Sequence, residues 1–181
     1  MNRFPMNPRA QAGVTMIELL VVMTIGGILA AVAVPGLRDM LRTTRQSSAF
    51  GLVMSDLNLA RGEAIKRNAR MLMCARDNAV TNVTQCGTDW RRGWLVCVES
   101  TATADTCSGV TAAVPIPVVA VRPPLDSSLT MVGSAAVIRF NPNSSQGPQN
   151  VPAVATLTVS GTWSSPTPRI ATIAATGNIT R

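Results

Sequence analysis

Apolar residues dominate the first part of the chain, where residues 19–37 contain no charged side chain. A run of this length is about what an α-helix needs to cross the hydrocarbon core of a bilayer, which is roughly 30 Å thick. Glu18 lies at the start of the run, where burial of its carboxylate in lipid would cost at least about 2.5 kcal/mol. The pattern predicts a membrane helix whose acidic residue needs a cationic partner.

The helical periodicity continues beyond Pro35 and Gly36 but becomes amphipathic. A proline within a helix removes a backbone hydrogen bond, so we expect a bend or a local opening at these two residues. Apolar residues then recur at spacings of three and four, which predicts one buried stripe formed by Phe50, Val53, Leu57, Ala60 and Ala64. The other side is basic and is expected to face solvent or another chain; it carries Arg42, Arg45, Arg61, Lys66, Arg67 and Arg70.

After Arg70 the pattern changes from helical to extended. Short apolar runs bounded by turn residues predict antiparallel strands at 71–74, 94–98, 118–121, 129–132, 136–140, 154–159 and 169–173. Two polar segments, 141–150 and 161–168, predict exposed connections, and the second contains Trp163. The predicted fold class is α+β. A membrane helix over 14–37 continues as an amphipathic helix over 38–70, which packs on a mostly antiparallel β head over 71–181.

The composition argues against an enzyme. The chain of 181 residues contains no histidine, so the usual general base and the commonest metal ligand are missing. We find no phosphate-binding loop, no nucleophile elbow and no paired-carboxylate motif. The sequence therefore predicts no catalytic residue, no metal, no cofactor and no small-molecule substrate.

The segment before the apolar run, residues 1–13, carries Arg3 and Arg9, has no acidic residue and ends in a glycine. A secretory signal places its small-residue cleavage site after the apolar segment, whereas the candidate site here lies before it. Cleavage after Gly13 would leave the apolar helix on the mature chain and make Glu18 its fifth residue. It would also lower the formal charge from +7 to +5 by removing the two arginines.

Gly13, the segment 15–20 and Pro35 resemble the corresponding part of a type IV prepilin. The resemblance implies a bacterial inner-membrane peptidase and methylase that cuts after Gly13 and methylates the amine of Val14, although Val14 departs from the usual Phe or Met. It also implies that Glu18 meets the terminal amine of a neighbouring subunit. The implied location is a single pass through the inner membrane with the head in the periplasm, followed by a pilus or pseudopilus. An ordinary signal anchor, with Glu18 at the headgroup level, is the alternative.

Four cysteines have spacings unlike those of a structural zinc site: Cys74, Cys86, Cys97 and Cys107. For a head outside the cytoplasm, disulfides are the expected state. The pairing of 74 with 86 and of 97 with 107 is favoured because it needs only local closure. The main alternative pairs 74 with 97 and 86 with 107. Loops of this size make each bridge worth about 3 kcal/mol by the chain-entropy argument.

The segments 61–68 and 89–96 resemble the minor pilins and pseudopilins of the GspH/FimT family. The resemblance covers the prepilin segment, the end of the helix and the following chain up to about Val98. Trp90 and Trp94 lie in the second segment, and we expect them to anchor a hairpin on the apolar stripe of the helix.

The resemblance implies three functions. The favoured one is a minor pilin that takes part in type IV pilus assembly, in a priming or tip complex, and contacts other major and minor pilins. A second is a pseudopilin of a type II secretion system. The third is a DNA-binding minor pilin for natural transformation, a role associated with a C-terminal Gly-Arg-x-Arg motif. Here the tail 177–181 keeps only the glycine and a final arginine. Weak DNA contacts would come from Arg91, Arg92, Arg169 and Arg181.

Overall fold

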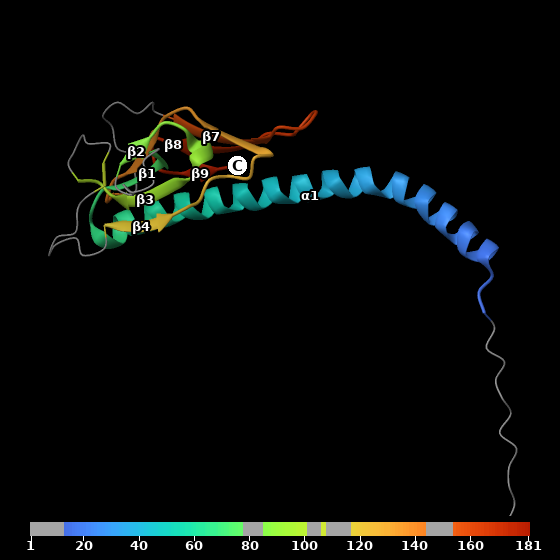
Figure 1. Ribbon diagram of the computed structural model, residues 1–181. Helices are drawn as coiled ribbons and strands as arrows, with labels where there is room; N and C mark the ends of the chain where they lie inside the picture. Colours follow the sequence, from blue (N-terminus) through green and yellow to red (C-terminus); the bar gives the residue numbers. More distant parts are fainter. Residues whose placement is uncertain (1–12, 78–84, 101–105, 108–116, 144–153) are drawn as a thin grey trace, which may run out of the picture. The chain divides into compact units, whose positions relative to one another are not determined.

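The computed structural model describes residues 13–77, 85–100, 106–107, 117–143 and 154–181. The described chain forms two compact units, the first ending at Leu41 and the second beginning at Arg42. One helix, α1 (Met16–Arg67), contributes to both units (Figure 1). It is α-helical without interruption at Pro35 and Gly36, so the local opening expected there is absent. The bend at these residues stays a prediction.

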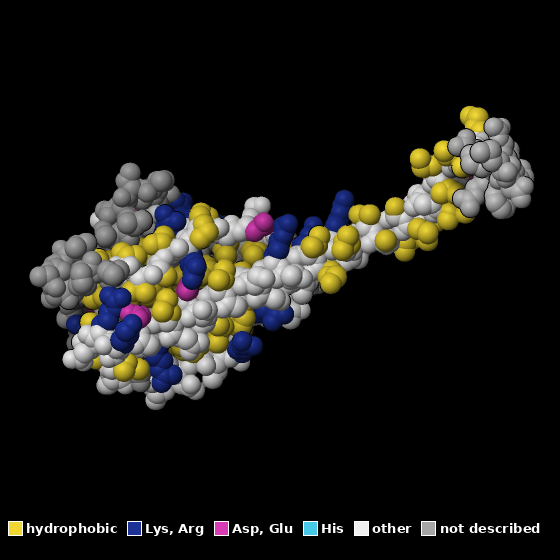
Figure 2. Space-filling view, turned by 90° about the horizontal axis from the view of Figure 1, so that it is seen from below, with side chains coloured by type: hydrophobic (Ala, Val, Ile, Leu, Met, Phe, Trp, Pro, Cys, Tyr) yellow, Lys and Arg dark blue, Asp and Glu magenta, His cyan; other side chains and the backbone are white. Residues whose placement is uncertain are grey.

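The first unit consists of the N-terminal part of α1. Apolar side chains cover this part of the helix (Figure 2), and Ile17, Leu29 and Val32 are 72%, 65% and 75% exposed. A window of 18 residues in α1 has a mean hydropathy of 2.4, so the helix is long and apolar enough to cross a membrane. A lipid or protein environment would remove this exposed apolar surface from water.

The second unit is the head, which contains the C-terminal part of α1 and two antiparallel sheets (Figure 1). The first sheet has five strands: β1 (Met71–Arg76), β2 (Cys86–Gly87), β3 (Trp94–Val98), β4 (Val118–Val121) and β6 (Val137–Phe140). Their order is β2-β1-β3-β4, and β6 also pairs with β1. The second sheet, in the order β5-β7-β8-β9, contains β5 (Leu129–Gly133), β7 (Val154–Gly161), β8 (Arg169–Ala174) and β9 (Ile179–Thr180).

The buried stripe predicted on α1 is confirmed. Phe50 is 5% exposed, and Val53, Leu57, Ala60 and Ala64 are 0% exposed. They form one core with inward-facing residues of both sheets, among them Met73, Trp94, Ile138, Leu157 and Ile173. Side chains alternate along β1 and β3, so Leu72 and Leu95 lie in a second, smaller cluster on the face of the first sheet away from α1. The predicted class, a long helix packed on antiparallel sheets, is confirmed.

Several local details differ from the prediction. The two-residue strands β2 and β9, and a 3₁₀ turn η1 (Trp90–Arg92), were not predicted. Trp163 is half-buried and packs against the main core, so the segment 161–168 is only partly exposed. The helix ends at Arg67, and Asn68 follows in the left-handed region with φ of 49°. Residues 144–150, most of the other predicted connection, lie outside the described residues.

Leu57→Ala should lower the free energy of unfolding of the head by about 2–5 kcal/mol, because it opens a cavity in a fully buried part of the core. All buried residues of the described chain lie at or beyond Gln46, so the head beginning at Arg42 is the appropriate protein for chemical denaturation. Leu52→Ala is the matched control on the same helix. Leu52 is 46% exposed, and its truncation should cost less than about 1 kcal/mol. Equal losses for the two variants would contradict the packing of the stripe.

Candidate functional site

The segment predicted to be processed lies at the start of α1. Val14 is 72% exposed, and Gly13 is also exposed. The hydroxyl oxygen of Thr15 accepts a hydrogen bond from the backbone N–H of Glu18 at 3.3 Å, and its carbonyl accepts one from Leu19 at 3.2 Å. Thr15 therefore caps the helix, with Glu18 three residues later as in a capping box. The candidate cleavage point thus lies in accessible, non-helical chain just before the cap.

Glu18 lies in the first turn of α1, where its negative charge interacts favourably with the helix dipole. No cation within the described chain forms an ion pair with it. This interaction with the helix end is screened in water and is much smaller than the cost of burying a carboxylate in lipid. A cation from outside the described residues would remove that cost.

A buried carboxylate joins the helix of the head to the first sheet. Asp56 on α1 is 1% exposed and accepts a hydrogen bond from Nε1 of the buried Trp94 at 2.8 Å. Its two oxygens also accept bonds from Nε and Nη2 of Arg122 at 2.7 and 2.8 Å. The hydrogen bonds to Asp56 raise the pKa of Arg122 above its ordinary value. The bidentate pair compensates the desolvation of Asp56 and satisfies the indole N–H at the same time.

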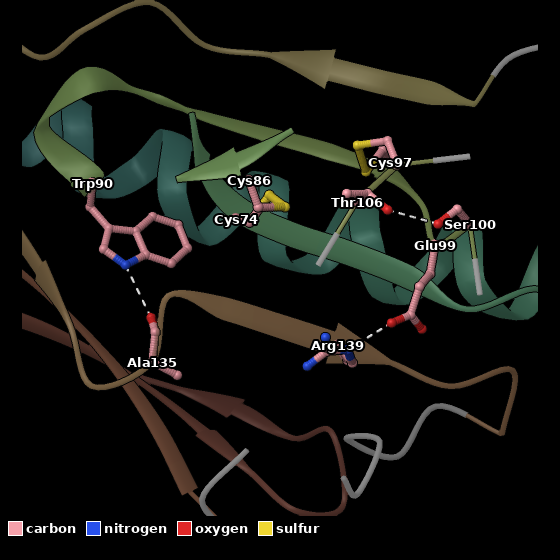
Figure 3. The surroundings of a disulfide bond; sticks show 10 residues. Cys74, Cys86, Trp90, Cys97, Glu99, Ser100, Thr106, Ala135 and Arg139 are labelled. Carbon is pink, nitrogen blue, oxygen red and sulfur yellow. Dashed lines mark hydrogen bonds and ion pairs between the residues drawn. A yellow bond between two sulfur atoms is a disulfide. The ribbon is translucent and has the colours of Figure 1, made fainter. Parts of the chain in front are cut away.

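A second buried carboxylate, Glu99, follows β3. Its side chain is 1% exposed and accepts a hydrogen bond from Nε of Arg139 on β6 at 2.8 Å (Figure 3). Arg70 approaches the other oxygen at 3.4 Å. Arg70 was predicted to face solvent on the helix; that prediction is wrong, because the helix ends earlier and the side chain pairs with Glu99. The acid at position 99, directly after an apolar strand, signals the need for a cation but does not identify Arg70 or Arg139 as that cation.

The disulfides lie on the face of the first sheet away from α1. They join Cys74 to Cys86 and Cys97 to Cys107, each with 5.6 Å between Cα atoms, which is the pairing favoured from the sequence. Figure 3 shows the first bridge between β1 and β2. The second disulfide joins residue 107 to β3. In addition, the backbones of Gln85 and Thr106 pair in an isolated antiparallel β-bridge. The bridges therefore hold short segments over the smaller apolar cluster.

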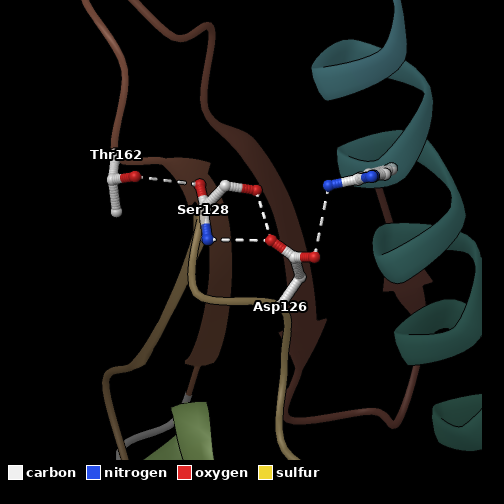
Figure 4. A network of polar contacts seen from close by, with 4 residues as sticks. Asp126, Ser128 and Thr162 are labelled. Atoms are coloured by element: carbon white, nitrogen blue, oxygen red, sulfur yellow. Dashed lines mark hydrogen bonds and ion pairs between the residues drawn. The ribbon is translucent and has the colours of Figure 1, made fainter.

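Asp126 ties the connection between β4 and β5 to the helix. Its carboxylate accepts bonds from the backbone N–H and the hydroxyl of Ser128 at 2.9 and 2.6 Å (Figure 4). Arg45 on α1 pairs with the other oxygen at 3.3 Å. The bonds from Ser128 lower the pKa of Asp126, with a smaller contribution from the charge of Arg45. Arg45, expected on an exposed basic face, is exposed but paired.

The four arginines considered for DNA binding fall into two groups. Arg91 and Arg92 belong to η1, and both pair with Asp89, at 3.3 and 3.5 Å. The hydrogen bond from Arg91 lowers the pKa of Asp89. η1 adjoins β5, because Nε1 of Trp90 donates to the carbonyl of Ala135 at 3.1 Å and Asp89 to Arg91 form a pocket with residues 130–133.

Arg169 begins β8, which lies between β7 and the edge strand β9, and Arg181 directly follows β9. β9 pairs with β8 at two positions, Thr172 with Thr180 and Ile173 with Ile179. The described residues do not bring all four arginines onto one strip.

A capped apolar helix, a processing motif before it and an antiparallel head define a subunit of the type IV pilin class. Residues 8–34 match the prokaryotic N-terminal methylation motif, and residues 51–177 match the model of type II transport protein GspH. The chain belongs to this GspH family, whose members are minor pilins and pseudopilins.

Relatives and solved structures agree with the assignment. The chain is 33% identical over 109 residues to the type IV major alpha-pilin of Moraxella bovis, covering 58% of this chain and 68% of that protein. It is 46% identical over 44 residues to the fimbrial protein EcpC of Eikenella corrodens, covering 24% of this chain and 29% of that protein. Two crystal structures of the type IV minor pilin FimU of Pseudomonas aeruginosa share the fold. Their TM-scores are 0.54 and 0.51 at 18% identity, over 74% of this chain and 85% and 90% of theirs.

Asp56→Ala should lower the free energy of unfolding of the head by about 3 kcal/mol, because it leaves the Trp94 indole N–H and the partly buried Arg122 without their acceptor. Denaturation followed by tryptophan fluorescence measures the loss. The matched control is Asp126→Ala, which removes the solvent-exposed ion pair with Arg45 and the local bonds from Ser128 and should cost clearly less than Asp56→Ala. A loss for Asp56→Ala no larger than the control would show that the buried pair is dispensable.

Proposed function

We propose that this chain is a non-catalytic minor pilin that takes part in assembly of a type IV pilus. The position of Glu18 carries the proposal: a carboxylate in the first turn of a helix whose next residues, 19–37, are uncharged. Such a charge is tolerable in a membrane or a filament core only beside a cation. The terminal amine of a neighbouring processed subunit has the required charge and would be presented at the start of the same type of helix.

The proposed maturation supplies that amine. Cleavage after Gly13 and methylation of Val14 create a charged N-terminus a few residues before Glu18, which agrees with the match to the methylation motif. Before assembly the apolar part of α1 would hold the protein in the bacterial inner membrane. The head would lie in the periplasm, an oxidising compartment in which the two disulfides persist. The proposed partners are the processing peptidase and methylase and other major and minor pilins.

Two observations support a pilus rather than a secretion pseudopilus. The relatives named above are a type IV major alpha-pilin and a fimbrial protein, and the similar solved structures are of a type IV minor pilin. The family model, however, bears the name of a type II transport protein, so a pseudopilin is the alternative function. Recovery of the chain in sheared pili, compared with loss of protein secretion on deletion, distinguishes the two.

DNA uptake is the weaker alternative. Non-specific DNA binding depends on several cations that neutralise phosphates along one strip. Asp89 pairs with both Arg91 and Arg92, whereas Arg169 and Arg181 belong to β8 and to the chain after β9, which do not pair with β5. We therefore expect weak, salt-sensitive DNA binding by the head.

Glu18→Ala should leave leader removal and membrane insertion intact but reduce incorporation into pili by about tenfold or more, because the neighbouring amine would lose its acceptor. Immunoblots of membranes and of sheared pili measure the two steps separately. Gly13→Val is the matched control, since a bulky residue at the cleavage point should block leader removal and leave a longer membrane protein. Normal incorporation of Glu18→Ala would contradict the proposed pairing, and normal processing of Gly13→Val would contradict the assignment as a prepilin.

A further inference from the structure

A cavity of about 480 Å³ lies in the head between α1 and the connection from β7 to β8. Its lining includes two residues of α1 and four of the connection and β8: Thr43, Gln46, Trp163, Ser165, Thr167 and Arg169. None of its lining residues is acidic. The cavity therefore combines three hydroxyl groups, an indole ring and a guanidinium group.

The walls of this cavity are held in place by the fold. Gln46 is 2% exposed and its amide nitrogen donates to the carbonyls of Val159 and Thr167 at 3.0 and 2.7 Å, so both amide hydrogens are used. The indole ring of Trp163 packs against Gly161: a Cβ atom at position 161 would come within 2.0 Å of the ring. Gln46 and Trp163 are therefore ordered before a ligand binds, whereas Ser165, Thr167 and Arg169 are exposed to solvent.

Arg169 supplies the charge of the site. Its guanidinium forms no hydrogen bond or ion pair within the described chain. Most other arginines of the head have an acidic partner: Arg45, Arg67, Arg70, Arg91, Arg92, Arg122 and Arg139. Among the described residues, Arg169 is the one basic residue that lines the cavity. The site is thus positive and favours an anion.

We propose that this cavity binds a carboxylate side chain on an acidic peptide segment of another protein. A planar guanidinium matches a carboxylate through two parallel hydrogen bonds, and the hydroxyl groups of Ser165 and Thr167 can donate to its remaining lone pairs. The indole of Trp163 offers an apolar face to the aliphatic part of a Glu side chain. A nucleic-acid backbone would instead need a strip of several cations, whereas Arg169 is the one basic residue in the described lining of the cavity.

The test follows the indole N–H signals of the three tryptophans by ¹⁵N NMR, with the full chain in detergent micelles. The probe is the blocked tripeptide acetyl-Ala-Glu-Ala-amide, compared with its neutral Gln analogue, inorganic phosphate and a short single-stranded DNA. We expect a saturable shift of the Trp163 signal with the Glu peptide and none with the Gln peptide. Trp90 and Trp94 are internal controls, because their N–H groups are bonded inside the head to Ala135 and Asp56.

Arg169→Gln should weaken binding of the Glu peptide by about tenfold or more. Arg169→Lys should give an intermediate loss, because lysine keeps the positive charge but cannot donate two parallel hydrogen bonds to the carboxylate. Arg61→Gln, which removes an arginine of α1 outside the cavity, should bind normally. Unchanged Trp90 and Trp94 signals show that each variant is folded. The proposal would be overturned if the Glu peptide did not shift the Trp163 signal, or if Arg169→Gln bound the peptide as tightly as the unaltered chain. It would also be overturned if phosphate or DNA bound more tightly than the Glu peptide.

Discussion

The head depends on the carboxylate of Asp56, because this one side chain fixes α1 against the first sheet. The apolar stripe of the helix supplies most of the burial, but hydrophobic contact is non-directional and would tolerate a rotated or shifted helix. A buried carboxylate does not tolerate such a shift, since it would lose its bonds to Trp94 and Arg122 together. Asp56 therefore sets the register of the helix, while the stripe drives the packing.

The two faces of the first sheet are stabilised by different means. The face toward α1 belongs to the main core, in which helix and both sheets bury alternate side chains of β1 and β3. No helix covers the other face in the described chain, and its smaller cluster depends on two disulfides that hold residues 86 and 107 against the strands. A small cluster buries too little apolar surface to order these segments alone, so covalent links are the stabilising term there. This arrangement requires an oxidising compartment and agrees with the proposed periplasmic position of the head.

Features with a short period in the sequence were predictable, and features that join distant residues were not. Spacings of three and four identified the stripe from Phe50 to Ala64, and alternation identified the longer strands. Local loop closure favoured the observed disulfide pairing. By contrast, β2 and β9 have two residues each and no periodicity, and Arg122 is 66 residues from Asp56. The sequence around Asp56 does not identify Arg122 as its partner, and the sequence around Arg122 does not identify Asp56. This ion pair, like that of Arg70 with Glu99, therefore follows only from the tertiary fold.

The ion pairs of the head reduce the positive charge that is available to a binding partner. A formal charge of +7 suggests a basic surface, but charge affects a partner only where it is exposed and uncompensated. In the head, acidic residues hold most of the described arginines in ion pairs, including both arginines of η1. Three of these acidic residues, Glu63, Asp89 and Glu99, are each shared by two basic side chains, so part of the positive excess remains around the pairs and is spread over the head. Arg169 differs because its guanidinium has no partner within the described residues. One uncompensated charge in a cavity with neutral polar walls suits recognition of a single anionic group, whereas a duplex would require several cations along one strip.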